Sequence, residues 1–231
     1  LVALRSSAPV SMPGMMDTVL NVGINPEVRD GIARETGRPD VAAQIWLRFC
    51  RMYAATVLEM DRTQIDDVVG APVDADTCNA AAERLRHAAE AFGAIPDDPH
   101  AQIRGGVEAV LRSWNSRRAR LFRETEQIDE DLGTAVVVQA MVFGNLDEHS
   151  GTGVVFTRNP ANGRNEPYGD YLARAQGEDV VGGTHEVDGL DTLASGLPAV
   201  YQELMEVRDR LEHHYRDMCD VEFTIASGRL Y

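Results

Sequence analysis

The chain has 231 residues, 44% of them hydrophobic and 26% charged, a composition typical of a folded globular protein with one large domain or two small ones. Its 22 basic and 37 acidic residues give a formal net charge of −15. Nucleic-acid backbones are bound by clustered positive charge, so we expect no nucleic-acid partner. Apolar runs stay well below the roughly 18 residues of a membrane helix, so we expect no membrane partner either.

All 22 basic residues are arginine. The lack of lysine excludes a Walker A loop and the strand lysine of protein kinases, both of which place an ammonium group on nucleotide phosphates. If the chain binds phosphates, arginines, backbone N–H groups and a metal ion must supply the positive charge. The three cysteines Cys50, Cys78 and Cys219 are far apart and indicate reduced thiols in a cytoplasmic protein.

The N-terminal segment predicts a strand followed by a loop. Residues 1–5 are mostly apolar, and small residues, two prolines and a glycine fill the stretch from Ser6 to Asp17. Met12, Met15 and Met16 lie close together in this loop, and their simplest interpretation is gap-filling core side chains.

Residues 26–125 have a helical pattern. Apolar residues recur at three- and four-residue spacing over 42–57, which predicts one helix. We expect a second helix from Asp76 or Thr77 to Phe92 and a third over 101–124. Strand signals are missing here, so the sequence predicts a helical subdomain.

The period changes after this subdomain. Residues 135–144 and 152–158 are β-branched and apolar, and the polar stretch 145–151 between them predicts a hairpin. Residues 168–183 predict a strand and a glycine-rich loop. An amphipathic helix is expected over 198–217, and two further strands over 220–225 and 229–231. The fold class is therefore α+β.

The strand at 220–225 carries the sharpest chemical pattern. Alternation places Asp220, Glu222 and Thr224 on one face and the three apolar residues on the other. Two carboxylates at this spacing suit a shared Mg²⁺ or a ribose hydroxyl. From spacing alone, an ordinary half-exposed strand with its polar residues outward is the simpler interpretation.

Arg5 ends an apolar strand and precedes two serines. A guanidinium there suits bidentate binding of a phosphate, with Ser6 and Ser7 as further donors. The alternative is a surface arginine at a strand end.

Two loops also suit anions or metals. Small residues in 145–152 let backbone N–H groups approach an anion, although Asp147 and Glu148 disfavour direct phosphate contact. The neighbouring carboxylates Glu178 and Asp179 lie in a glycine-rich loop. An exposed hairpin and a solvated turn are the respective alternatives. The six histidines form no metal-ligand pattern, and we predict no catalytic residue in this chain.

The sequence also resembles a known family. Similarity to the ATP-binding domain of the pyruvate, phosphate dikinase family runs in order along the chain and is most specific in MPGMMDTVLN and AQGEDVV. The similar segments are 2–25, 112–119, 133–145, 150–163, 168–183 and 218–231. Phosphoenolpyruvate synthases share the architecture but resemble these segments less closely. The resemblance implies an incomplete ATP-grasp-type fold with an inserted helical subdomain, which holds ATP between two α+β subdomains.

The resemblance assigns roles to single residues. Arg5 and Thr152 would contact the nucleotide phosphates, and Met16 would line the nucleotide pocket. Asp220 and Glu222 would act at the ribose and Mg²⁺ end of the site.

Further assignments concern two segments. Glu178 and Asp179 match an acidic loop of the ATP site, and the strand at 135–142 would border the adenine. The implied organisation is a strand and loop at 1–25, a helical subdomain at 26–130 and a β-rich ATP-grasp-like subdomain at 131–231.

The family reaction converts ATP, phosphate and pyruvate to AMP, pyrophosphate and phosphoenolpyruvate. A histidine on a separate swivelling domain attacks the β-phosphorus of ATP and carries the phosphoryl group to pyruvate. The implied partners are therefore ATP, phosphate, pyruvate or phosphoenolpyruvate, and the phosphohistidine domain of the same protein. The resemblance is also compatible with a homodimer.

The chain departs from the full family pattern at both ends. A lysine-bearing glycine-rich segment would precede Leu1, and a glutamine of the metal site would follow Tyr231. The phosphohistidine motif and the pyruvate barrel are not in this sequence. We therefore expect a piece of a longer enzyme that binds nucleotide weakly and is inactive by itself. The alternatives are a non-catalytic nucleotide-binding or regulatory relative and a phosphoenolpyruvate synthase-like enzyme.

Overall fold

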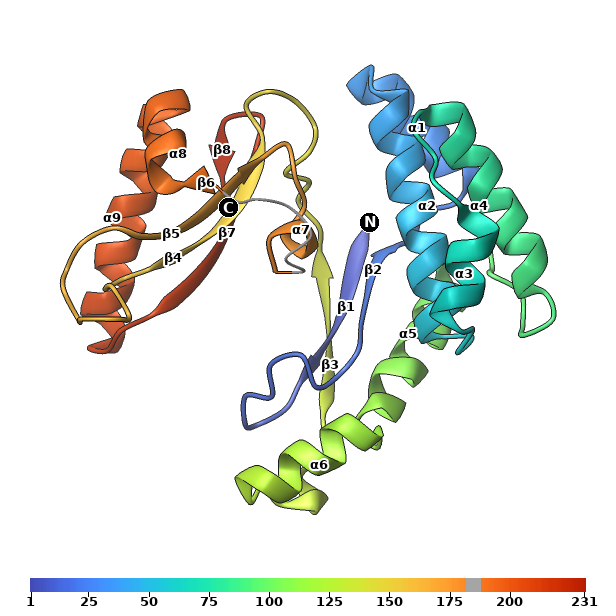
Figure 1. Ribbon diagram of the computed structural model, residues 1–231, viewed down its shortest axis with the longest axis horizontal. Coiled ribbons are helices and arrows are strands. Elements are labelled where there is room, and N and C mark those ends of the chain that lie inside the picture. The colour runs from blue at the N-terminus through green and yellow to red at the C-terminus, as the bar shows by residue number, and fades with distance from the viewer. Residues whose placement is uncertain (182–187) are drawn as a thin grey trace. The chain divides into compact units, whose positions relative to one another are not determined.

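A computed structural model describes residues 1–181 and 188–231, without the side chains of Glu178 and Val181. The chain divides into two compact units, Leu1–Met141 and Val142–Tyr231, which are described separately below as the first and second unit. Each unit combines helices with one antiparallel sheet, which confirms the predicted α+β class (Figure 1). Among the described residues, no helix combines the length and the apolar character that a membrane crossing requires.

The sheet of the first unit has the strand order β2-β1-β3. Strand β1 (Val2–Ser7) confirms the strand predicted at the N-terminus and pairs antiparallel with both neighbours. Strand β2 (Thr18–Val22) was not predicted, and it follows the methionine-rich loop directly. Strand β3 (Ala135–Ala140) comes from the far end of the unit.

One face of this sheet is covered by a helix. Leu4 and Val19 are fully buried there, and helix α5 (Pro99–Ser113) packs against them. The approach is so close that a Cβ on Gly106 would lie 2.4 Å from the Leu4 Cδ1 atom. Alternation places the side chain of Arg5 on the opposite face.

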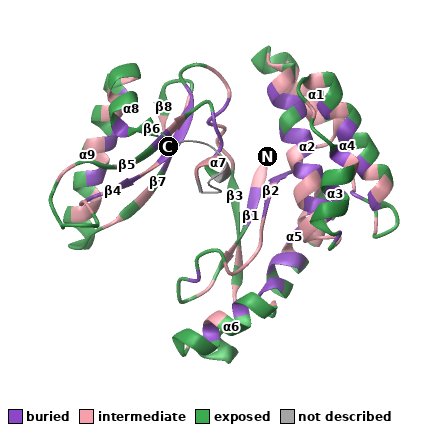
Figure 2. Cartoon of the chain, viewed as in Figure 1, coloured by how far each residue is buried: buried purple, intermediate pink, exposed green. Residues whose placement is uncertain are grey.

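The predicted hairpin of 135–144 with 152–158 is wrong. Strand β3 pairs only with β1 among the described residues, whereas β4 (Gly151–Phe156) pairs with β5 and β7 in the other sheet. The β3 strand is an edge strand that is exposed along most of its length (Figure 2). Its Val137 and Val138 side chains are 44% and 54% exposed.

Residues 26–125 contain helices and no strand, as their apolar spacing predicts. Besides α5, these helices are α1 (Pro26–Thr36), α2 (Pro39–Thr56), α3 (Arg62–Val69), α4 (Ala75–Ala89) and α6 (Arg117–Glu126), and a 3₁₀ turn follows at Glu130–Leu132. Helix α2 is their centre, since Ile45, Trp46 and Phe49 are all fully buried. Helix α4 begins one or two residues earlier than predicted, because Asp74 forms a capping box with Thr77.

The helix predicted over 101–124 is two helices. Helix α5 ends at Ser113, and Ser116 begins α6 by accepting a hydrogen bond of 3.2 Å from the Ala119 N–H group. Trp114 lies in the break and packs with Met12 and Ala119 in a small separate cluster. The apolar series therefore continues through the break although the helix does not.

A buried glutamine joins three segments of the first unit. The Gln102 side chain is fully buried, and its Nε2 donates to the carbonyls of Ile24 and Pro96, both at 2.8 Å. Its Oε1 accepts a hydrogen bond of 2.7 Å from the Gly23 N–H group. One side chain thus satisfies three backbone groups that secondary structure leaves unpaired.

The second unit contains a five-stranded antiparallel sheet in the order β6-β5-β4-β7-β8. Its other strands are β5 (Tyr168–Ala173), β6 (Asp188–Gly189), β7 (Asp220–Ala226) and β8 (Arg229–Leu230). Helices α8 (Leu190–Gly196) and α9 (Pro198–Tyr215) cover one face of it, and a short helix α7 (Gly177–Val181) follows β5 (Figure 1). The core between sheet and helices includes Val155, Leu193, Leu204, Phe223 and Ile225.

The three free cysteines differ in their surroundings, which predicts their order of reaction. Cys50 and Cys78 are buried, and burial raises the pKa of both thiols, whereas Cys219 is half-buried. Because the thiolate is the reactive form, we expect a thiol reagent to modify Cys219 first and Cys50 last. Peptide mass spectrometry after short labelling times checks this order, with a denatured sample as the control in which all three react. Early labelling of Cys50 in folded protein would contradict the packing of α2.

Candidate functional site

Strand β7 places its two carboxylates as the alternation predicts. Asp220 and Glu222 are exposed, while Phe223 and Ile225 are buried against α8 and α9. Strand geometry puts the two acidic residues about 6.6 Å apart along one face of the sheet. Glu222 lies opposite Val154 of β4 in the register. The pair therefore lies on the sheet face away from the two helices.

The structure adds a third carboxylate to this face. Asp170 of β5 also lies opposite Val154, on the other side from Glu222. Two strand spacings, or about 9.6 Å, separate the backbones of Asp170 and Glu222. The alternation of 168–173 around the buried Tyr171 is a sequence signal for an outward Asp170. The sequence contains no signal for the strand order that brings Asp170 beside Glu222.

These carboxylates are spread along the sheet instead of converging. Within the described part of the chain, no group of three or more histidine, cysteine, aspartate and glutamate side chains is arranged to hold a metal ion. Asp220 and Glu222 still fit Mg²⁺ chemically, because hard cations take carboxylate oxygens as ligands. Mg²⁺ usually binds through one or two carboxylates and completes its shell with water and phosphate oxygens.

Thr152 lies on the same face of the sheet as Asp220 and Glu222, toward the other end of β7. It is opposite Thr224 in the register, two residues beyond Glu222 on β7. The side chain is only 3% exposed, and its hydroxyl donates a hydrogen bond of 3.0 Å to the Phe223 carbonyl. A Cβ on Gly177 of α7 would lie 3.9 Å from the Thr152 Oγ1. The hydroxyl proton is therefore engaged within the protein, and the oxygen keeps its capacity to accept.

The acidic loop before α7 is closed by Asp179. Its carboxylate accepts a hydrogen bond of 2.9 Å from the Gln176 N–H group, and its own N–H donates to the Gln176 carbonyl at 2.9 Å. The Gln176 side chain is 5% exposed, and its Nε2 donates to Asn145 Oδ1 at 3.4 Å. Asp179 thus holds this turn in place. The side chain of Glu178 lies outside the described residues.

The loop before β4 is organised around Asp147. Its Oδ1 accepts hydrogen bonds from the His149 N–H group at 2.9 Å and from the Ser150 hydroxyl at 2.7 Å. Its Oδ2 accepts one of 2.5 Å from the Ser227 hydroxyl, in the turn between β7 and β8. Burial acts to raise the pKa of this carboxyl, but the hydrogen bonds from Ser227 and Ser150 outweigh it and lower the pKa.

Two predicted site residues belong to the first unit. Arg5 is exposed, and its Nη1 donates to Gln139 Oε1 of β3 at 3.5 Å. Met16 is half-buried and packs against the Met12 and Trp114 cluster, as a gap-filling side chain would. The described structure thus brings Thr152, Asp220 and Glu222 onto one face in the second unit and places Arg5 and Met16 in the first.

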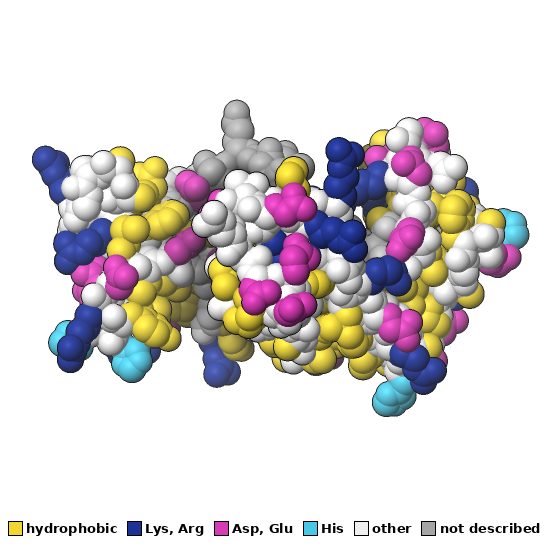
Figure 3. Space-filling view, turned by 90° about the horizontal axis from the view of Figure 1, so that it is seen from below, with side chains coloured by type: hydrophobic (Ala, Val, Ile, Leu, Met, Phe, Trp, Pro, Cys, Tyr) yellow, Lys and Arg dark blue, Asp and Glu magenta, His cyan; other side chains and the backbone are white. Residues whose placement is uncertain are grey.

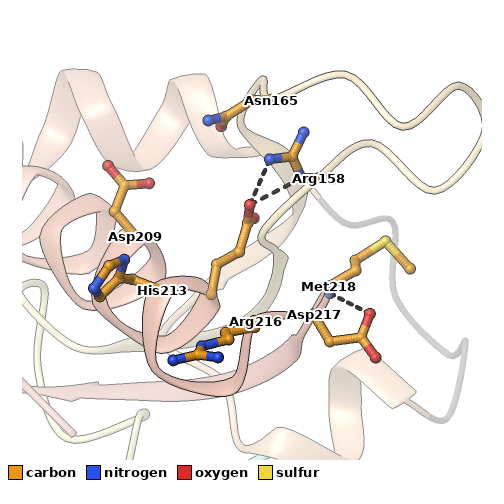
Figure 4. Close-up of a pocket in the computed structure, with 8 residues that line it drawn as sticks. Arg158, Asn165, Asp209, His213, Arg216, Asp217 and Met218 are labelled. Atoms are coloured by element: carbon orange, nitrogen blue, oxygen red, sulfur yellow. Dashed lines mark hydrogen bonds and ion pairs between the residues drawn. The ribbon is translucent and has the colours of Figure 1, made fainter.

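A hollow of about 590 Å³ lies elsewhere on the second unit (Figure 4). Its lining is Arg158, Asn165, Asp209, Glu212, His213, Arg216, Asp217 and Met218, which includes none of the predicted site residues. Arg158 and Glu212 form an ion pair of 2.6 Å across it, and this hydrogen-bonded guanidinium holds the pKa of Glu212 below its ordinary value. The Asp217 carboxylate accepts from the Met218 N–H group. Several of the polar groups in the hollow therefore satisfy one another.

Charges are mixed on the molecular face seen in Figure 3. Both acidic side chains and arginines are exposed there, with hydrophobic side chains between them. On neither unit do the described residues of this face form one continuous basic patch.

Comparison with known proteins identifies the family. Residues 1–201 match the family model "Pyruvate phosphate dikinase, AMP/ATP-binding domain". The whole chain aligns with pyruvate, phosphate dikinase of Clostridium symbiosum at 44% identity over 246 residues, covering 28% of that protein. It aligns with the Rickettsia conorii enzyme at 38% identity and the chloroplastic enzyme 1 of Arabidopsis thaliana at 41%, covering 28% and 25% of them. The chain thus spans about a quarter of the length of these relatives. The chain belongs to the pyruvate phosphate dikinase AMP/ATP-binding domain family.

Proposed function

We propose that this chain is the ATP-binding part of a pyruvate, phosphate dikinase. The observation that carries the proposal is the family match over residues 1–201. In the complete protein, the β-phosphoryl group of ATP would pass to a histidine of another domain and then to pyruvate, with phosphate as the second acceptor. ATP, phosphate and pyruvate are thus the substrates that we propose for the whole protein.

We propose an ATP-grasp-type fold for the nucleotide domain. In support, each unit is an antiparallel sheet with helices on one face. The face of the second sheet away from α8 and α9 carries a polar row from Asp220 through Glu222 to Thr224 and Thr152. At about 3.3 Å per residue this row is about 13 Å long, which suits an extended ligand better than a single ion.

The residues would divide the work by their chemistry. Asp220 and Glu222 would accept hydrogen bonds from ribose hydroxyls or ligate Mg²⁺, which when bound neutralises phosphate charge. The Arg5 guanidinium would bind phosphate oxygens in a bidentate manner. Thr152 would accept a hydrogen bond at its hydroxyl oxygen, or its O–H group would rotate away from the Phe223 carbonyl and donate to a phosphate oxygen. Positioning and charge neutralisation of this kind make up most of the catalysis of phosphoryl transfer.

Calorimetric titration of Mg·ATP into the full-length protein tests the nucleotide site. We expect Arg5→Ala to weaken binding by about tenfold or more, because a hydrogen bond to a charged group contributes about 1.5 to 3 kcal/mol. Arg34→Ala, which removes an exposed arginine from α1 of the same unit, is the matched control and should bind as the parent does. Equal affinities of the two variants would reject a phosphate role for Arg5. Failure of the parent to bind ATP would reject the proposed function.

A further inference from the structure

The loop that precedes β4 is tied to two other segments of the second unit. The Ser150 carbonyl accepts a hydrogen bond of 2.8 Å from the Arg174 N–H group, just after β5. The His149 carbonyl accepts one of 2.8 Å from the Gly228 N–H group, in the turn between β7 and β8. Both ties depend on the loop's conformation, because the two carbonyls are neighbours and point to different partners.

One carboxylate holds that conformation. Asp147 accepts from the backbone of His149 and from the hydroxyls of Ser150 and Ser227, so both of its oxygens are used. The Ser150 Oγ in turn accepts from the Ser227 N–H group at 2.9 Å. Ser150 is fully buried, although its side chain is polar, which shows how completely this small network encloses it.

The hydrogen-bond network around Asp147 lies next to the polar row in the sequence. Ser150 is followed directly by Gly151 and Thr152, and Gly151 has no room for a side chain because a Cβ would lie 2.6 Å from the Tyr171 ring. Gly144, at the other end of the loop, is equally constrained, since a Cβ there would lie 2.3 Å from the Ala175 carbonyl oxygen. Because Gly144 and Gly151 are closely packed, the loop has little freedom to absorb a displacement of Ser150, which only Gly151 separates from Thr152.

We propose that Asp147 is a positioning residue of the nucleotide site: its carboxylate fixes the loop 144–151 on β5 and on the β7–β8 turn, and thereby places Thr152 for ATP. This proposal rests on the proposed function. A direct electrostatic role of Asp147 predicts the opposite change in ATP affinity when the charge is removed. A carboxylate near phosphates repels them, so removal of its charge alone would strengthen ATP binding.

Asp147→Asn in the full-length protein is the main test. The amide keeps the size of the side chain but cannot accept at both of its terminal positions. We expect the affinity for Mg·ATP, measured by calorimetry, to fall about tenfold, and amide hydrogen exchange at His149, Ser150 and Gly228 to become faster. Glu148→Gln is the matched control, because it removes the same charge from an exposed neighbour in the same loop. For Glu148→Gln we expect the same ATP affinity and the same exchange rates as for the parent.

Ser227→Ala supplies a second and milder variant. It removes only the bond to Asp147 Oδ2 and keeps the carboxylate, so it tests the network if Asp147→Asn fails to fold. We expect a smaller loss of ATP affinity and, in the double variant, no further loss beyond that of Asp147→Asn alone.

The outcomes are distinct. ATP affinity equal to or greater than that of the parent in Asp147→Asn, with faster exchange in the loop, would overturn the proposal and leave the proposed function intact. A parent protein that does not bind ATP would overturn both. An equal loss of affinity in Glu148→Gln would also overturn the proposal, because the loss would then not depend on the hydrogen bonds that Asp147 accepts.

Discussion

Replacing Glu222 by glutamine in the full-length protein should lower the rate of the nucleotide half-reaction by about a hundredfold or more. Glu222 is an exposed carboxylate in the middle of the polar row, so the substitution removes a charge without creating a cavity. Loss of one group that stabilises charge during reaction typically costs about 10² to 10³ in rate. Under the proposed function, the half-reaction with phosphoenolpyruvate uses other parts of the protein, so its rate should stay unchanged.

Rapid-quench assays of the two half-reactions check this result. Glu203→Gln, which changes an exposed carboxylate on α9 to the same amide, is the control and should leave both rates unchanged. Loss of both half-reactions in a folded Glu222→Gln protein would reject the assignment, because it would indicate a general structural role.

Replacing Gln102 by methionine should destabilise the first unit by about 3 to 5 kcal/mol. Methionine keeps the volume of the side chain but leaves the Gly23 N–H group and the carbonyls of Ile24 and Pro96 without their partner. Each buried polar group left unpaired costs about 1 to 3 kcal/mol. The loss should therefore come from hydrogen bonding and not from packing.

Urea unfolding of the 231-residue chain measures this loss. Both tryptophans, Trp46 and Trp114, lie in the first unit, so their fluorescence reports on the unit that contains Gln102. Gln44→Met on the exposed side of α2 is the matched control, and we expect it to change the free energy of unfolding by less than about 0.5 kcal/mol. A similar midpoint for Gln102→Met and Gln44→Met would show that the three backbone groups find water instead.

Local patterns were sufficient to predict most elements. The alternation at 220–225 predicted which residues of β7 are buried, and the apolar spacing at 42–57 predicted most of α2. Both signals arise within one element, from the period of side chains on a strand or a helix. The break between α5 and α6 was missed, because Trp114 continues the apolar series while it packs in a different cluster.

Strand pairing could not be predicted in the same way. The pairing of β3 with β1 joins Val2 to Ala140, and no local period records a contact over that separation. The position of Asp170 beside Glu222 could not be predicted for the same reason, because it depends on the strand order β5-β4-β7. The hydrogen bonds of Asp147 were not predicted either, since its partner Ser227 lies 80 residues away in the sequence. The roles of the predicted site residues stay predictions.

The open edge of β3 has a practical consequence for work with the separate chain. Among the described residues, one edge of β3 has no strand partner, and such an edge with Val137 and Val138 exposed is a template on which another strand can form backbone hydrogen bonds. Concentrated solutions of the chain therefore favour edge-to-edge association, which would remove protein from a titration and lower the apparent stoichiometry. Dilute samples reduce this association, and Val138→Lys should reduce it as well, because natural sheets carry charged residues on edge strands to avoid the same contact.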